Sequence, residues 1–207
     1  MENIYSRIKK LNVELKKTLN DKINLTDYDI DLGNESSSAL LPKYLAEFYK
    51  ENSHLKIEWE TRELVGENSW KPCGRINILK ADLVLSDWKE VVYFDGDSQE
   101  LKQFKIVDNF VPEAHCGFLL NENNSDAMYY HESGEPELVP LGVDFSGYLE
   151  LMFMARGFWY WQQAVLLIKN GRTSTTAAGD FKTYMPQIFP DFKWEEFVGL
   201  WERVRIK

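Results

Sequence analysis

The chain has 207 residues, of which 44% are hydrophobic, and it contains seven tryptophans and only two cysteines. A chain of this size can bury about 70% of its unfolded surface, so its core does not require disulfides or structural metals. The formal net charge is −9, and residues 81–140 contain 13 acidic and 3 basic side chains. This concentration of negative charge disfavours nucleic-acid binding through that region and favours a basic partner.

The N-terminal residues form an amphipathic pattern rather than a signal sequence. Apolar residues recur at helical spacing with lysines between them: Ile4, Ile8, Leu11, Leu15 and Leu19. Because they contain no continuous apolar run, we expect a reduced, cytoplasmic protein rather than a secreted one. The segment TDYDIDLGNESSS (residues 26–38) is polar and turn-rich, which is typical of a linker. The following segment, LLPKYLAEFYKEN, predicts a helix with Pro42 in its first turn and an apolar face of Leu45, Phe48 and Tyr49.

Alternation of apolar and polar residues begins at HLKIEWE (residues 54–60), where Leu55, Ile57 and Trp59 share one face. GRINILK repeats this pattern, and ADLVLSDW predicts a short helix. Further strand candidates are FKIVDNF (104–110), CGFLL (116–120), AMYYH (127–131) and ELVPL (137–141). Short strands at roughly ten-residue spacing predict an α+β fold, with a meandering, mostly antiparallel sheet flanked by helices and with extra N- and C-terminal helices.

The stretch VDFSGYLELMFMARGFWYWQQAVLLIK (residues 143–169) has the length of a membrane span. Glu150 and Arg156 lie inside it, and a charged group costs about 2.5–3.5 kcal/mol at the centre of a membrane helix. We therefore expect a buried helix of a soluble protein from Phe145 to Ile168. Gly157 permits either close packing or a break in this helix.

The aromatic cluster GFWYWQQ (residues 157–163) could stack a base or a sugar. At helical spacing its rings spread around the axis, which favours core packing instead. Asp144 is placed to cap the long helix at its start. The remaining tail predicts two helices, one ending near Pro186 and one starting at Asp191. The second of these is expected to bury Phe197, Leu200, Trp201 and Val204.

No group of residues has the spacing of a metal site. The three histidines and two cysteines contain no pair at CxxC or HxxxH spacing. The segment DGDSQE (residues 95–100) begins like a calcium loop, but Glu100 and Ile106 occupy the positions that require Gly and Glu. The sequence therefore predicts no metal, no cofactor and a tight acidic turn at this segment.

No nucleophile has a matching base in the sequence, and GxSxG, P-loop and GxGxxG patterns are absent. His115 and Cys116 are adjacent, but neighbouring side chains of a strand face opposite sides, so we expect an inert, buried cysteine. In a metal-dependent nuclease, Asp87 and the triplet ELK (residues 100–102) would hold the ion. Asp/Glu-x-Lys triplets occur five times in this highly charged chain, so solvated charge is the preferred interpretation.

The order of several weak motifs resembles the SUKH superfamily, over residues 40–163. These motifs are LLPKYLAEFYKEN (40–52), IEWE (57–60), GRINIL (74–79), FKIVDNF with GFLL, YYH (129–131) and LGVDFSGYLELM (141–152). The superfamily includes bacterial immunity proteins of polymorphic toxin systems and fungal regulators of cell-wall glucan synthesis. The resemblance implies an α+β binding scaffold without shared catalytic residues.

The expected division of the chain is an N-terminal helix and linker (1–35), a SUKH-like domain (36–170) and a C-terminal helical extension packed on it (171–207). Resemblance and charge together predict a non-catalytic module, an immunity protein that neutralises a basic, nuclease-type toxin. The alternatives are a regulatory scaffold of the cell-wall type without a toxin and, less favoured, a metal-dependent nuclease. We expect neither nucleic acid nor a membrane as partner.

The predicted contacts with this partner are eight acidic residues in turns, where side chains stay solvated until binding. They are Asp95, Asp97 and Glu100 in one turn, and Glu122, Asp126, Glu132, Glu135 and Glu137 in later turns. Charges of this kind act mainly on the rate of association.

Overall fold

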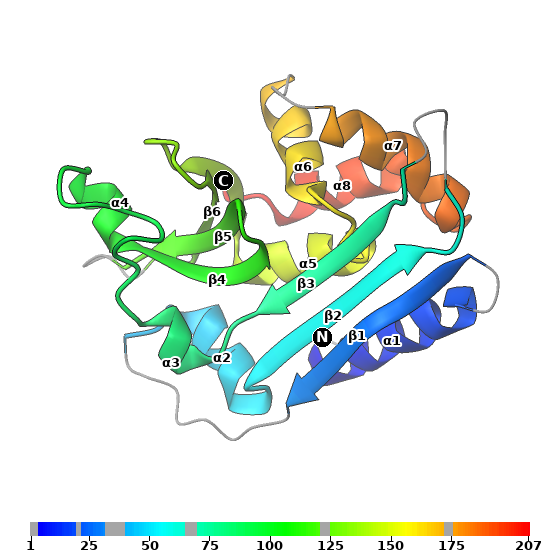
Figure 1. The fold of residues 1–207 in the computed structure, drawn as a ribbon, viewed down its shortest axis with the longest axis horizontal. Helices are drawn as coiled ribbons and strands as arrows, with labels where there is room; N and C mark the ends of the chain where they lie inside the picture. The colour runs from blue at the N-terminus through cyan, green and yellow to red at the C-terminus, as the bar shows by residue number, and fades with distance from the viewer. Residues whose placement is uncertain (1–3, 20–21, 32–39, 65–69, 121–124, 172–175) are drawn as a thin grey trace. The chain divides into compact units, whose positions relative to one another are not determined.

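The computed structural model describes residues 4–19, 22–31, 40–64, 70–120, 125–171 and 176–207. Seven strands form one antiparallel meander, in which each strand lies next to its neighbours in sequence (Figure 1). The strands are β1 (Ile23–Asp31), β2 (His54–Thr61), β3 (Cys73–Ile78), β4 (Phe104–Val111), β5 (Ala114–Leu119), β6 (Ala127–Glu132) and β7 (Val139–Asp144). The predicted α+β class and meandering sheet are confirmed.

Eight helices accompany the sheet in the described part of the chain. They are α1 (Ile4–Leu19), α2 (Lys43–Glu51), α3 (Ala81–Val84), α4 (Gln99–Gln103), α5 (Phe145–Ala155), α6 (Trp161–Asn170), α7 (Ala177–Ile188) and α8 (Trp194–Val204). None of these described helices is long and apolar enough to cross a membrane. Contacts divide the chain into two compact units, the first with Met1–Asp29, Lys56–Ile76 and Leu149–Val204, the second with Ile30–Leu55, Asn77–Tyr148 and Arg205–Lys207.

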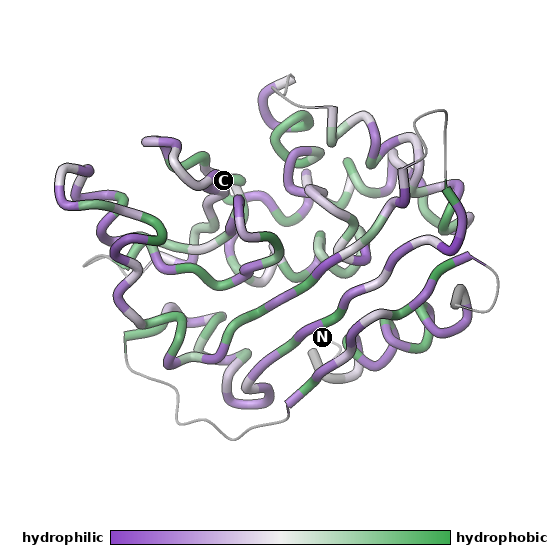
Figure 2. Tube along the Cα trace, viewed as in Figure 1, coloured by the Kyte–Doolittle hydropathy of each residue, from purple (hydrophilic) through white to green (hydrophobic). Residues whose placement is uncertain are grey.

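The first unit combines α1 with the C-terminal helices. The apolar face of α1 is buried as predicted, through Ile8, Leu11 and Leu15. Helix α6 packs against α7 (Figure 1). The predicted alternation along β2 is confirmed, and Figure 2 shows hydrophilic and hydrophobic residues alternating along β2 and β3. The ring of Phe181 lies 5.0 Å from that of Phe197, in an aromatic core of this unit.

The second unit is built on α2 and strands β4 to β7. Helix α2 follows Pro42 and buries Leu45, Phe48 and Tyr49, as the sequence predicts. The Phe48 ring meets Phe145 edge to face at 5.6 Å. Helix α5 starts in this unit, where Asp144 Oδ1 accepts a hydrogen bond from the Gly147 N–H at 2.7 Å, so the predicted cap is confirmed.

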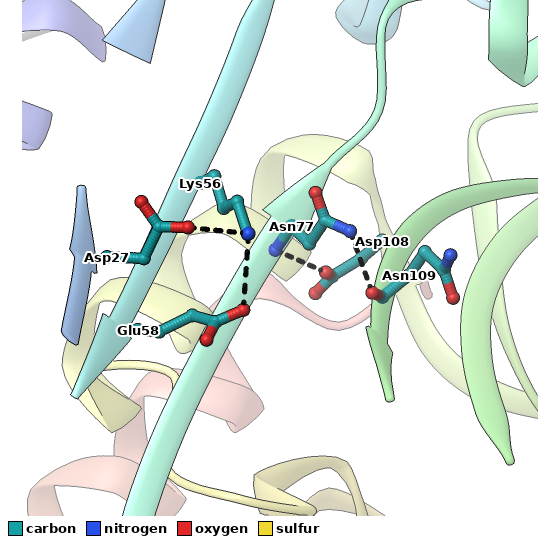
Figure 3. A network of polar contacts seen from close by, with 6 residues as sticks. All are labelled: Asp27, Lys56, Glu58, Asn77, Asp108 and Asn109. Atoms are coloured by element: carbon teal, nitrogen blue, oxygen red, sulfur yellow. Dashed lines mark hydrogen bonds and ion pairs between the residues drawn. The ribbon is translucent and has the colours of Figure 1, made fainter. Parts of the chain in front are cut away.

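The predicted linker over residues 26–38 is wrong for residues 26–31, which belong to β1; residues 32–38 lie outside the described part of the chain. The polar residues suit β1 because it is the outermost strand of the sheet, and charged side chains are common on such edges. Asp27 pairs with Lys56 of β2 at 2.6 Å, and Glu58 lies 3.6 Å from the same ammonium group (Figure 3). A cross-strand ion pair therefore occupies a segment that composition alone marks as a loop.

The predicted helix from Phe145 to Ile168 is interrupted between α5 and α6. Arg156, Gly157 and Tyr160 have positive φ values of 52°, 65° and 57°. The interrupted backbone pairs with β3: the Arg75 N–H donates to the Gly157 carbonyl at 2.7 Å, and the Trp159 N–H donates to the carbonyl of Cys73 at 2.8 Å. The break thus replaces helical hydrogen bonds with bonds to the sheet.

The C-terminal helices differ slightly from the prediction. Helix α7 continues two residues beyond Pro186, to Ile188. Helix α8 starts at Trp194 rather than Asp191. Of the residues expected to be buried by α8, Phe197, Leu200 and Trp201 are buried and Val204 is half-buried.

We predict that Gly157→Ala destabilises the protein by about 3 kcal/mol or more, because it adds steric overlap to backbone strain. A Cβ at Gly157 would lie 2.5 Å from Ile76 Cγ1 and 3.0 Å from the Arg75 carbonyl oxygen. Gly171 is the matched control, because its φ is 70° but an added Cβ meets nothing within 4 Å. Gly171→Ala is expected to cost only about 1 kcal/mol of backbone strain. Urea unfolding measures both changes, and equal losses would contradict the close packing at Gly157.

Candidate functional site

The segment that runs from α3 into the first turn of α4, residues 82–100, combines negative charge with exposed apolar side chains. It carries six carboxylates and one lysine. Of the seven large hydrophobic residues exposed in the described part of the chain, three lie here: Leu83, Val91 and Phe94, at 46%, 51% and 58% exposure. Val84 and Val92 are buried and anchor the same segment. We call residues 82–100 the acidic segment.

Local hydrogen bonds hold the acidic segment in one conformation. Asp97 Oδ2 accepts a hydrogen bond from the Phe94 N–H at 2.7 Å. Asp87 Oδ1 accepts hydrogen bonds from the Tyr93 hydroxyl and, at 3.1 Å, from the Lys89 N–H. The Tyr93 hydroxyl is the main cause of the lowered pKa of Asp87. Phe94 is therefore presented to solvent by a turn that its own carboxylates stabilise.

The predicted turn with Asp95, Asp97 and Glu100 is only partly a turn. Asp95 is exposed and Asp97 is half-buried within the turn. Glu100, however, lies in the first turn of α4, which starts because Ser98 Oγ accepts a hydrogen bond from the Leu101 N–H at 3.2 Å. The prediction of a turn at Glu100 is wrong because the Ser98 side chain caps a helix that starts one residue earlier, at Gln99.

Among the later predicted contacts, Asp126 has a structural role. Its Oδ1 accepts a hydrogen bond from the Tyr44 N–H at 3.1 Å, at the start of α2, where Pro42 provides no side-chain cap. Burial raises the pKa of Asp126, and the bond from Tyr44 acts in the opposite direction. A carboxylate distant in sequence thus supplies the missing N-terminal cap of α2. Glu122 lies outside the described residues.

The other predicted contacts lie around the turn between β6 and β7. Glu132 is half-buried and accepts a hydrogen bond from the Tyr130 hydroxyl at 2.8 Å, whereas Glu135 and Glu137 are exposed. Burial lowers the pKa of His131, against the effect of its hydrogen bond to the Glu135 carbonyl and of the charges on Glu132, Asp97 and Glu135. Acidic residues from the two predicted turns therefore act on one buried imidazole.

The nuclease pattern is not assembled as a nuclease requires. Residues 100–102 belong to α4 and not to a strand, and the Asp87 carboxylate is occupied by Tyr93 and Lys89. The described residues contain no group of three or more His, Cys, Asp or Glu side chains placed to hold a metal ion.

A fully buried carboxylate, Asp108, lies on β4 without a basic partner among its described contacts. It accepts a hydrogen bond from the Asn77 N–H at 2.9 Å (Figure 3). A second hydrogen bond comes from the Tyr148 hydroxyl at 2.7 Å. Burial raises the pKa of Asp108 to about 6, although both hydrogen bonds act to lower it. The strand register shifts between Ile106 and Asp108, which places this side chain in the interior.

The structure also pairs a hydroxyl with an imidazole, which the sequence reasoning missed. His115 Nε2 lies 3.2 Å from Ser133 Oγ, and His115 Nδ1 lies 2.9 Å from Asn109 Oδ1. The expectation that no nucleophile has a neighbouring base is therefore wrong. The adjacent Cys116 is buried, as expected. No spacing in the sequence indicates the pair, because β4, β5 and the turn after β6 each contribute one residue.

In the first unit, a cavity of about 320 Å³ lies between α1, α5 and α8. Arg156 lines it with a side chain that is only 7% exposed and contacts Asp191 and, at 3.6 Å, Glu14. Its guanidinium also lies 4.7 Å from the centre of the Phe189 ring. Four basic and four acidic side chains line the cavity, so it presents no single charge to a ligand.

No protein-family model, curated protein or solved structure matches the chain. The resemblance to the SUKH superfamily therefore rests on the sequence motifs alone.

We predict that Asp108→Asn removes a pH effect on stability that opposes the effect of His115. The folded pKa of Asp108 is about 6, above its ordinary value of 3.8, so its stabilising effect is complete below pH 3.8 and is lost as the pH rises through 6. Burial, and secondarily the charge of His131, lowers the pKa of His115 to about 4, so its stabilising effect exists above pH 6.5 and is lost as the pH falls.

The stability of Asp108→Asn relative to wild type should therefore rise by about 3 kcal/mol between pH 3.5 and pH 7.5. The variant should also lose stability more steeply than wild type on acidification from pH 6.5 to pH 4, because the opposing effect of Asp108 is removed while that of His115 remains. Urea unfolding across this range measures both quantities. A stability difference that is independent of pH would contradict the raised pKa of Asp108.

Proposed function

We propose that the protein is a binding module for a basic protein partner, of the immunity type that its sequence resembles. It would neutralise a nuclease-type toxin domain in the cytoplasm by covering it. The observation that carries the proposal is the acidic segment, where Leu83, Val91 and Phe94 are exposed among six carboxylates. No catalysis is needed for this function.

The composition of the acidic segment suits protein recognition. Binding energy in protein interfaces is concentrated in a few apolar or aromatic anchors, whereas surrounding charges set partner choice and association rate. Phe94 is the natural anchor because it is a large aromatic residue that the Asp97 hydrogen bond holds in an exposed turn. The carboxylates around it favour a partner of opposite charge.

A toxin that cleaves nucleic acid matches this requirement. Such a protein must hold phosphate groups, and it does so with lysine and arginine side chains. An inhibitor that covers the same surface needs carboxylates where the nucleic acid has phosphates. The acidic segment and the exposed Glu135 and Glu137 provide them.

The identity of the partner separates this proposal from the alternatives. Tagged protein is used to capture partners from cells of the source organism, and bound proteins are identified by mass spectrometry. The captured protein is then purified, tested for toxicity, and titrated with the wild-type chain. A basic toxin domain whose activity is suppressed at equimolar ratio supports the proposal, whereas a cell-wall or signalling enzyme would replace it with the regulatory function.

We predict that Phe94→Ala weakens binding to the identified partner by about 2 kcal/mol, or roughly 30-fold in Kd, because it removes the anchor. The matched control is Val13→Ala on α1, an apolar residue with 50% exposure that lies outside the acidic segment. Calorimetric titration measures both variants. An unchanged Kd for Phe94→Ala would exclude Phe94 as an anchor of the interface.

We further predict that reversing three carboxylates to lysine slows association without unfolding the protein. Glu100, Glu135 and Glu137 are suited to this because they are exposed, whereas Asp97 and Asp126 hold backbone groups. Steering by exposed charges also weakens as salt shortens the screening length to about 8 Å at physiological strength.

Stopped-flow association at several salt concentrations tests this prediction. The control is the triple reversal of Glu51, Glu63 and Glu195, which changes the net charge equally at exposed positions outside the predicted site. Only the first triple variant should lose both rate and salt dependence. Equal slowing by the two variants would show that net charge, and not the predicted site, steers the partner.

A further inference from the structure

Three side chains meet where the β4–β5 hairpin lies beside the turn that follows β6. Asn109 of β4 contacts one ring nitrogen of His115 on β5, at 2.9 Å, and Ser133 contacts the other at 3.2 Å. The Ser133 N–H donates to the Glu113 carbonyl at 2.9 Å, which holds this turn against the hairpin. The Ser133 hydroxyl also lies 3.3 Å from the Pro112 carbonyl oxygen.

These contacts determine where the protons lie. An amide oxygen can only accept, so the contact with Asn109 Oδ1 places the imidazole proton on Nδ1 of His115. In the neutral ring, Nε2 is then an acceptor and faces the Ser133 hydroxyl. The hydroxyl proton has two acceptors, His115 Nε2 and the Pro112 carbonyl. His115 itself is 2% exposed, whereas Ser133 is exposed to solvent.

We propose that Ser133 is a nucleophile that accepts an acyl group from a small activated ester, with His115 as its base and Asn109 as a positioning residue. The three residues have the mutual geometry required of a nucleophile, a base and a group that orients the base. The exposed position of Ser133 allows an ester to reach Oγ, and the strands on either side hold the imidazole in place.

Ser133, His115 and the ester account for every bond and proton of the acylation step. Ser133 Oγ forms a bond to the carbonyl carbon of the ester while its proton moves to His115 Nε2. The bond between that carbon and the alcohol oxygen breaks, and the proton on Nε2 goes to the leaving alcohol. The products are the Ser133 ester and the free alcohol. Water can repeat the sequence on the Ser133 ester and release the carboxylic acid.

The rate of acylation depends on how basic His115 is, and its surroundings make it a weak base. Burial is the main cause of its lowered pKa, about 4, and the charge of the opposing His131 adds to it, while Glu113 acts in the opposite direction. The imidazole is therefore unprotonated at neutral pH and free to accept the hydroxyl proton, but it is a weak base. Acylation and hydrolysis of the Ser133 ester both use this weak base, so both steps should be slow. An activated ester acylates faster than water deacylates, so the Ser133 ester should accumulate.

The experiment treats the purified full chain with p-nitrophenyl acetate at pH 7.5 and follows the acetyl ester on each serine by peptide mass spectrometry. Ser133 should be acetylated at least about 100-fold faster than Ser125, an exposed serine whose hydroxyl contacts no imidazole among the described residues and accepts a hydrogen bond from the Ala127 N–H. Ser125→Ala should leave the Ser133 rate unchanged, and His115→Asn should abolish the difference. A Ser133 rate no higher than that of Ser125 overturns the proposal.

Asn109→Asp tests the positioning role even if His115→Asn fails to fold. A carboxylate beside Nδ1 stabilises the imidazolium that forms during the reaction, so the Ser133 rate should rise. The midpoint of the pH–rate profile should also move upward, because the pKa of His115 follows the new charge. If His115 does not act as the base, Asn109→Asp changes neither the acetylation rate of Ser133 nor its pH profile, and this result overturns the proposal.

Discussion

The first unit depends on the hydrogen bond from the Trp59 indole N–H to the Arg156 carbonyl, at 2.7 Å, in a place where the helical ladder is interrupted. The carbonyl at the end of α5 can no longer be satisfied within a helix, and a buried unpaired carbonyl costs about 1–3 kcal/mol. Trp59 is itself 1% exposed and can approach because Gly74, on the neighbouring strand, has no Cβ to collide with the indole. One aromatic donor on β2 thereby fixes where the chain leaves α5.

The interruption between α5 and α6 also determines the position of other groups in the first unit. Arg156 and Tyr160 lie in the left-handed region at a cost of roughly 1–3 kcal/mol each, whereas Gly157 adopts its positive φ without steric strain. The bonds to β3 and the burial of Phe158 and Trp161 offset this cost. The same backbone conformation directs Arg156 towards Asp191 and Glu14 at the cavity beside α1. The strained backbone and the ion pairs of the buried Arg156 side chain therefore have one common cause.

The parts of the fold that the sequence predicts are those in which the local pattern and the tertiary environment agree. In β2 and α2 the apolar residues recur at the spacing of a strand and of a helix, and these same residues are buried in the structure. The periodicity of the sequence therefore predicts which side chains are buried. Strand β1 was missed because its polar side chains are stabilised by a neighbouring strand, as Lys56 shows for Asp27. Neither the sequence around Asp27 nor the sequence around Lys56 indicates that the two side chains form an ion pair.

The candidate sites were also only partly predictable from the sequence, because they depend on contacts between residues that are distant in sequence. The excess of carboxylates in residues 82–100 is visible in composition, but the exposure of Phe94 depends on a turn that only the fold defines. Asp126 resembles any solvated aspartate in sequence, yet it caps a helix more than 80 residues away. The contact of Ser133 with His115 arises from strand pairing between β5 and β6, which no short-range pattern encodes.

The pairing of β7 with the segment at Arg205 and Ile206 has a consequence for the order of folding. Each strand of the meander pairs with its sequence neighbour, so most of the sheet can form through short loop closures, which are fast. By contrast, Val143 faces Arg205, and the Ile206 N–H donates to the Gly142 carbonyl at 2.8 Å, across the whole length of the C-terminal helices. This closure requires a long loop and is expected to come late. Until then the outer edge of β7 presents unpaired backbone groups, so a partly folded chain is most prone to strand-to-strand association at that edge.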